Sequence, residues 1–271
     1  MKPIVFGDYT PLCRSYLLED FLADARGQNV VKSVHLDVGY DPANPVGETR
    51  WLQTLADRHG YPHGIVGYAD LSHPDVEDLL AAHCGAANFR GIRQSLNYDP
   101  DPVKTYLNRP GVSMEADWRR GFAKLRKFGL SFDLQIYWPQ MAECRELARA
   151  FPDQQIILNH TGMPVDQSPA GFDGWRKGMK LLAQAPNVAC KISGLGMGNF
   201  KWKPEDFRPW VMTAIDAFGV DRCMFASNFP VDKLFSSYNA IFDTFKTITR
   251  DFAPADKRKL FHDNAARFYR L

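Results

Sequence analysis

The chain has 271 residues, of which 45% are apolar, 13% aromatic and 24% charged. This composition is typical of globular proteins and excludes a disordered or fibrous chain. Lys and Arg total 33 against 31 Asp and Glu, a formal net charge of +2, so we expect no nucleic-acid partner. Folding buries roughly three quarters of the surface of a chain this long, and we expect one domain over residues 1–271.

The cysteines are odd in number, widely scattered and never in a CxxC spacing, namely Cys13, Cys84, Cys144, Cys190 and Cys223. This pattern indicates neither a disulfide framework nor a thiolate metal site. The start MKPIVFGDYTP lacks an apolar stretch of signal-peptide length, and no run approaches the roughly 20 apolar residues of a membrane span. We expect a cytoplasmic protein with no membrane partner, for which a homo-oligomer is an open alternative.

Short runs rich in Val and Ile alternate with stretches of helical period along the whole chain. In chain order the predicted helix–strand pairs are 16–29 and 30–38, 48–60 and 63–71, 76–84 and 89–95, 118–129 and 130–138, 140–151 and 154–160, 174–185 and 188–195, and 208–219 and 222–228. The segment from Tyr238 onward is helical, with no strand after it. Residues 97–114 form the longest stretch without a periodic pattern.

Strands that alternate with helices through short connections predict a parallel sheet, and we favour a TIM (β/α)8-type barrel over a doubly wound sheet. In SFDLQIY, polar Ser131, Asp133 and Gln135 share one face, as the interior of a barrel allows near its catalytic end. The same alternation places His35 and Asp37 on one face of their strand. The first unit contains no GxGxxG turn.

The chemistry of such a barrel lies at the carboxyl ends of its strands. The polar residues predicted there are His35, Asp37, Asp70, Arg93, Gln135, Tyr137, His160, Lys191, Ser193 and Asn228. Each has an alternative structural role, because buried polar groups need partners whether or not they catalyse.

Five segments together resemble a known family, namely FRGIRQS, QQIILNHTGMP, NVACKISGLG, DRCMFASNFPVDKL and NAARFYRL. They resemble the amidohydrolase-related family, and within it the group that contains dicarboxypyrone hydrolase and sugar lactonases. The resemblance spans nearly the whole chain. It implies a TIM-barrel enzyme that opens a small lactone or similar cyclic ester by adding water to an activated carbonyl.

The resemblance also implies site residues. Family members use a His at the end of the sixth strand, which matches His160, and an acidic residue at the end of the eighth, where this chain has Asn228. They carry His-x-His on the first strand, a motif that this sequence lacks. A hydrolytic divalent metal normally takes at least three protein ligands. We therefore expect no metal ligands and no cofactor, with zinc an option only if ligands absent from this chain are supplied.

The catalytic candidates are His160, Asn228 and Asp232. An amide cannot accept a proton at neutral pH, so Asn228 cannot serve as the base that a carboxylate would be. We expect His160 to act as base or electrophile, with Asp232 as the second candidate for the base. A helix cap is the alternative role of Asp232.

Arg93 is the candidate anchor for a substrate anion, because a guanidinium grips a carboxylate bidentately. Lys191 is expected either to polarise the carbonyl oxygen or to form a structural ion pair. Gln135, Tyr137 and Trp138 would form the adjoining wall. We expect Arg93, Gln135, His160 and Asn228 to converge on one pocket.

The leading hypothesis is a hydrolase acting on a small, carboxylated lactone. One alternative is a metal-dependent decarboxylase of the same superfamily. The other is a relative that binds a small acid without turning it over.

Seven strands are predicted, whereas a barrel of this kind has eight. In the resembling family the first strand carries the His-x-His and precedes the region that matches the start of this chain. MKPIVFGDYTP has the character of a loop, because Pro3 and Pro11 disfavour a central strand and Gly7 with Asp8 indicates a turn. The sequence therefore predicts that the first strand is missing from this chain, leaving two sheet edges to be covered.

Overall fold

The computed structural model describes residues 4–271, and its strands form one parallel sheet. The strands pair in chain order and are β1 Val34–Leu36, β2 Gly64–Tyr68, β3 Phe89–Ser95, β4 Ser131–Gln135, β5 Ile156–Leu158, β6 Val188–Ile192 and β7 Cys223–Phe225. Each lies within one of the seven ranges predicted from the sequence. The parallel α/β architecture is therefore confirmed.

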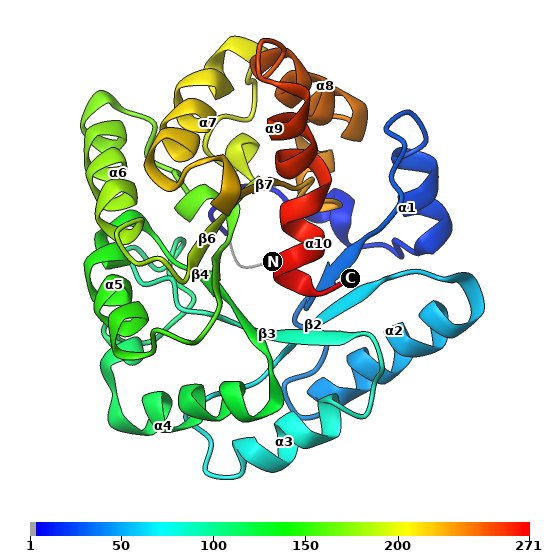
Figure 1. The fold of residues 1–271 in the computed structure, drawn as a ribbon, viewed down its shortest axis with the longest axis vertical. Helices are drawn as coiled ribbons and strands as arrows, with labels where there is room; N and C mark the ends of the chain where they lie inside the picture. Colours follow the sequence, from blue (N-terminus) through cyan, green and yellow to red (C-terminus); the bar gives the residue numbers. More distant parts are fainter. Residues whose placement is uncertain (1–3) are drawn as a thin grey trace.

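The strands surround a central axis and the longer helices lie outside them (Figure 1). The α-helices are α1 Leu18–Asp24, α2 Pro45–His59, α3 Val76–His83, α4 Ala116–Lys124, α5 Met141–Ala150, α6 Pro169–Leu182, α7 Pro204–Phe218, α8 Tyr238–Ile248, α9 Pro254–Arg258 and α10 Asn264–Tyr269. Among residues 4–271, no helix has both the length and the apolar character to cross a membrane.

Along each strand, side chains point alternately outward to the helices and inward to the interior of the curled sheet. Buried residues such as Phe132 and Leu134 pack outward into the main core beneath the helices. Inward residues form a second cluster inside the sheet, with Val66, Ile157, Ala189 and Met224 packed against Phe268 and Tyr269 of α10. The helix α10 therefore covers one end of the curled sheet (Figure 1).

The inward direction predicted for His35 is wrong. Val34 and Leu36 pack against the interior cluster, so the side chain between them points to the helical layer. There His35 Nε2 lies 3.0 Å from Oε1 of Glu48 on α2. Asp37, beyond the end of β1, does turn to the interior and contacts Arg93.

The two edge strands are β1 and β7. Residues 4–15 add no strand to the sheet; they contain an antiparallel bridge between Ile4 and Gly7 and a 3-10 turn at Thr10–Leu12. Residues 4–11 of the segment predicted to be a loop contain no sheet strand, as expected. Residues 1–3 lie outside the range that the structure describes. The missing first strand stays a prediction.

One buried histidine ties α2, α3 and β2 together. His83 on α3 makes a 2.8 Å hydrogen bond between Nδ1 and Thr49 Oγ1, and Nε2 donates to the Tyr68 carbonyl at 3.1 Å. Its ring stacks on Phe89 at a centroid distance of 4.8 Å. Burial disfavours the charged ring and lowers the pKa of His83 to about 4.

This histidine makes stability pH-dependent. In the unfolded chain His83 binds a proton below about pH 6.5, whereas the folded protein resists protonation until about pH 4, so stability falls as the pH is lowered between them. The linked loss is about 3 kcal/mol. We expect His83→Gln to flatten the dependence of the unfolding free energy on pH, measured by urea denaturation. His59→Gln, at an exposed position of α2, is the control, and an unchanged slope in His83→Gln would contradict this role.

Candidate active site

A strained turn after β5 places His160. His160, Thr161 and Met163 have φ values of 51°, 55° and 45°, and Gly162 has a φ of 70°. Left-handed backbone at several non-glycine residues is costly and is concentrated at functional sites. The turn is fixed by hydrogen bonds, because Trp175 Nε1 donates to the Thr161 carbonyl at 2.7 Å and Thr161 Oγ1 donates to the Ser193 carbonyl at 3.1 Å.

The imidazole of His160 is buried at the end of β5. Its Nδ1 lies 3.1 Å from Oγ of Ser193, while Nε2 makes no hydrogen bond within residues 4–271. Gly194 permits this approach, because a Cβ there would lie 3.0 Å from Cβ of His160. Burial, with the charges of Lys191 and Arg93, holds the pKa of His160 well below its ordinary value. The ring is therefore neutral at pH 7, with one nitrogen free for a ligand or water.

Arg93 lies on the inner face of β3 and is already paired. Its Nε donates to Asp37 Oδ1 at 2.7 Å, and Nη2 donates to the Asp37 carbonyl. The Nη1 group makes no hydrogen bond within residues 4–271 and is available for a ligand. Burial raises the pKa of Asp37 and Arg93 opposes that rise.

A buried ion pair crosses the interior from β6 to β4. Lys191 Nζ lies 3.1 Å from Asp133 Oδ1, and Tyr269 of α10 donates its hydroxyl to the same oxygen at 2.7 Å. Burial lowers the pKa of Lys191, and Asp133 opposes that shift. Sequence reasoning placed Asp133 on the polar face but did not select it. Tyr269 lies in NAARFYRL, a segment that supported the family resemblance, but it was not selected as a site residue.

An apolar cluster of Tyr137, Met163 and Met197, here called the mouth cluster, lies beside these polar groups. The Tyr137 hydroxyl donates to the Lys104 carbonyl at 2.7 Å, which ties the cluster to the long loop 97–114. Val5 and Phe6 of the N-terminal segment also pack on it. The carboxyl ends of the strands are thus partly covered by residues from the start of the chain.

Asn228 and Asp232 form a pair after β7. Asn228 has a φ of 55° and donates Nδ2 to Asp232 Oδ1 at 2.7 Å. Asp232 is 2% exposed, and burial raises its pKa to about 7 despite that hydrogen bond. The neighbouring Val231 packs on the mouth cluster, so this segment borders the same end of the sheet.

The other predicted residues are divided. Gln135 is buried on the inward face of β4, with the polar groups described above. Trp138 instead lies against α6, where a Cβ at Gly174 would be 2.7 Å from its ring. Asp70 accepts hydrogen bonds from Ser72 N and Gln94 Nε2, so it is committed to the turn after β2.

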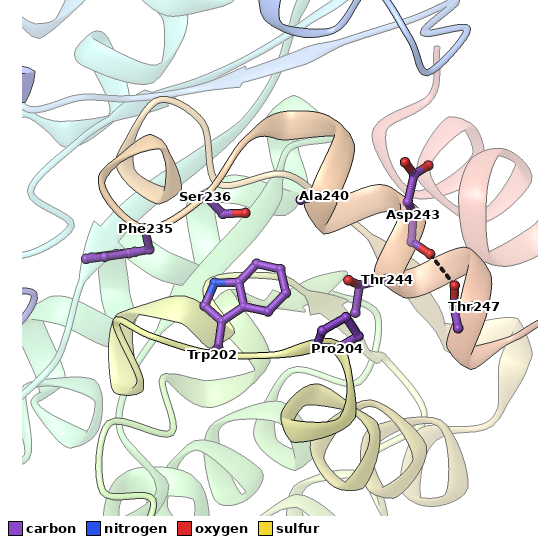
Figure 2. Close-up of a pocket in the computed structure, with 8 residues that line it drawn as sticks. All are labelled: Trp202, Pro204, Phe235, Ser236, Ala240, Asp243, Thr244 and Thr247. Atoms are coloured by element: carbon purple, nitrogen blue, oxygen red, sulfur yellow. Dashed lines mark hydrogen bonds between the residues drawn. The ribbon is translucent and has the colours of Figure 1, made fainter.

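Two surface pockets lie elsewhere. One of about 390 Å³ is lined by Trp202, Pro204, Phe235, Ser236, Ala240, Asp243, Thr244 and Thr247. Figure 2 shows Trp202 and Pro204 facing residues of α8 across it. The other, of about 300 Å³, is lined by Pro11, Leu12, Arg14, Tyr16, Pro230, Lys233 and Leu234. Neither contains any of the strand-end residues predicted to react.

The residues at the strand ends do not fit a divalent metal. No three His, Cys, Asp or Glu side chains within residues 4–271 are grouped to hold an ion. Lys191 and Arg93, which are cationic, act on His160, and the position after β7 offers an amide rather than a carboxylate. Because Asp37 and Asp133 are committed to those two cations, too few anionic ligands are left for a dication.

A family model described as an amidohydrolase matches residues 14–271. The chain belongs to the amidohydrolase family. This confirms the resemblance inferred from the sequence, and the chain is an enzyme of that family.

Three similar proteins illustrate this. The uncharacterized protein y4mH of Sinorhizobium fredii is 66% identical over 271 residues, covering 100% of this chain and 91% of that protein. The L-fucono-1,5-lactonase of Burkholderia multivorans is 28% identical over 236 residues, covering 83% of this chain and 77% of the enzyme. The crystal structure of an amidohydrolase from B. multivorans with bound Zn has a TM-score of 0.84 and 25% identity, covering 96% of this chain and 90% of that chain.

Because the similar amidohydrolase from B. multivorans has bound Zn, measuring the zinc content of this protein tests whether its strand-end residues can hold a metal. We expect the purified chain to contain far less than one zinc per molecule, because its mouth offers one free imidazole nitrogen beside two cations. Elemental analysis of protein prepared without chelator measures this. About one zinc per chain, retained through dialysis, would contradict the expectation.

Proposed function

We propose that this amidohydrolase opens a small lactone at the carboxyl ends of its strands, beside the mouth cluster. The observation that carries the proposal is a neutral, buried His160 with a free ring nitrogen, in the field of Lys191 and Arg93. Water adds to the ester carbonyl and gives a proton to the base. The ring C–O bond then breaks, the leaving oxygen takes up a proton, and a hydroxy acid is released.

Two groups are proposed for proton transfer. His160 accepts the proton of the attacking water at Nε2, since Ser193 occupies Nδ1. Asp232 is the second candidate, because a carboxyl group with a pKa of about 7 exchanges protons readily at neutral pH. Asn228 is proposed to orient that carboxylate through its 2.7 Å hydrogen bond rather than to move a proton itself.

The cations are proposed to act on the oxygens of the substrate. Lys191 polarises the carbonyl and stabilises the negative charge that develops on it. Arg93 presents Nη1 to a carboxylate of the substrate, and Gln135 with Tyr137 forms the adjoining wall. Trp138 is left out of this set because it lies against α6.

The similarity to lactonases supports this reaction for the family member described here. The proposal has three further parts. The substrate is a carboxylated lactone, the site works without a metal, and residues 1–271 form one barrel domain that lacks its first strand. Decarboxylation stays the alternative within the superfamily, although the metal ligands that we expected it to need are not grouped within residues 4–271.

Two substitutions separate the proposed base from the proposed anchor. His160→Ala should lower kcat by at least about 100-fold, because a general base acts in the transition state. Arg93→Ala should mainly raise KM for a carboxylated lactone, because an anchor away from the reacting carbonyl contributes uniform binding. The assay is the release of acid from butyrolactones with and without a carboxylate. Near-normal turnover in His160→Ala would end its assignment.

The pH dependence distinguishes the two candidate bases. If Asp232 is the base, kcat/KM should rise with pH through about 7, because only the ionised carboxylate accepts a proton. His160 is neutral across that range and adds no step there. In that case Asp232→Asn should remove the step at pH 7, whereas a kcat/KM without a step there would leave His160 as the base. A step that persists in Asp232→Asn would assign it to another group.

A further inference from the structure

The pocket between Trp202 and α8, here called the Trp202 pocket, has aromatic walls that are held in place by the protein itself. Its volume of about 390 Å³ lies within the roughly 300–1,000 Å³ of small-molecule sites. Trp202 is stacked on Phe207 with ring centroids 4.2 Å apart, and Phe235 is stacked on Phe200 at 4.8 Å. Because these contacts are internal to the chain, the walls are formed before a ligand arrives.

Thr244 on α8 directs an unsatisfied hydroxyl into the Trp202 pocket. The residue is 3% exposed and lines the pocket, and its Oγ1 makes no hydrogen bond within residues 4–271. Thr247, one turn further along the helix, instead donates its hydroxyl to the Asp243 carbonyl at 2.8 Å. Figure 2 shows the Thr244 oxygen pointing toward Trp202. A buried hydroxyl normally has a partner, which here has to come from outside the chain.

The Trp202 pocket offers no free charge to a ligand. Among the residues of the described chain that line it, Asp243 is the one that ionises near neutral pH. Its Oδ1 accepts a hydrogen bond from Gln28 Nε2 at 3.1 Å and pairs with Lys246 Nζ at 3.5 Å. Figure 2 shows the carboxylate of Asp243 pointing away from Trp202. An ionised ligand would therefore lose hydration without meeting an opposite charge.

We propose that the Trp202 pocket binds a small, uncharged aromatic compound that carries an amide or a hydroxyl. The ring packs against Trp202 and Phe235, and the polar group forms a hydrogen bond with Thr244 Oγ1, which can both donate and accept. Ser236 adds a second hydroxyl, whose one hydrogen bond within residues 4–271 is a long contact of 3.4 Å with the Ser237 carbonyl. No strand-end residue lines the pocket, so this inference does not depend on the proposed lactone hydrolysis.

Calorimetry with two ligands of the same shape tests the preference for an uncharged compound. Naphthalene-2-carboxamide is neutral at pH 7, whereas naphthalene-2-carboxylate is ionised. We expect the purified full chain to bind the carboxamide, and to bind the carboxylate at least about tenfold more weakly at this site.

Ala240→Phe identifies which binding belongs to the Trp202 pocket. Ala240 is exposed on α8 and lines the pocket, so a phenyl group there fills the space without disturbing the core. The substitution should abolish carboxamide binding. Any carboxylate binding that survives it belongs to another site and is subtracted.

Thr244→Val keeps the shape of the side chain and removes the hydroxyl. It should weaken carboxamide binding by about fivefold, the effect of one neutral hydrogen bond, without lowering the thermal unfolding midpoint. Thr247→Val is the matched control, because its hydroxyl is committed to the Asp243 carbonyl, and it should leave the affinity unchanged.

The proposal is overturned if the carboxamide does not bind, or if Ala240→Phe binds it with full affinity. Equal affinity for the carboxylate at this site, or an unchanged affinity in Thr244→Val, would also reject it.

Discussion

The ion pair between Lys191 and Asp133 is the constraint around which the interior is arranged. Both side chains are almost fully removed from solvent, at 6% and 0% exposure, and they lie 3.1 Å apart. Breaking such a pair by removing one partner typically costs about 3–5 kcal/mol, because the other charge is left buried alone. The pair therefore fixes the distance between β4 and β6 at this level. Asp133 Oδ1 also requires a second hydrogen-bond donor.

Tyr269 is that donor, and it connects the pair to the end of the chain. Its hydroxyl reaches Asp133 from α10, whose Phe268 packs against the inward apolar residues of the strands. The helix thus fills one end of the sheet with apolar contacts and supplies a polar group to its middle. Because α10 fills the interior from this side, the proposed site lies at the opposite end, where the carboxyl ends of the strands and the strained turn at His160 meet.

The charged side chains near His160 are arranged as neutral pairs. Arg93 is balanced by Asp37 and Lys191 by Asp133, so the two cations bring no net charge although both act on His160. The imidazole is kept neutral while the interior as a whole stays balanced. This arrangement suits a reaction in which negative charge appears only in the transition state, because the compensated cations respond to it without first requiring an anion to be bound.

Local patterns were enough to predict the strands, and the structure explains why. Each predicted range is a short apolar or alternating run that is long enough for one strand and is followed by a turn, and all seven strands fall within these ranges. The alternation in SFDLQIY also assigned Asp133 and Gln135 to the inward face. On β1 the same alternation failed, since His35 faces Glu48 of α2 while Val34 and Leu36 face inward. Three residues are too few to reveal which face a helix will cover.

The sequence by itself determined the order of elements, the family and the principal strand-end residues, because periodicity and short motifs are local properties of the chain. Only the tertiary structure decided the partners. Tyr269 lies 136 residues from Asp133, Asp37 lies 56 residues from Arg93, and the side chains of Asn97 and Asn159 are left without full partners by the packing around them. Such pairings depend on the closure of the sheet and on which groups other contacts have already satisfied, and no local pattern records either.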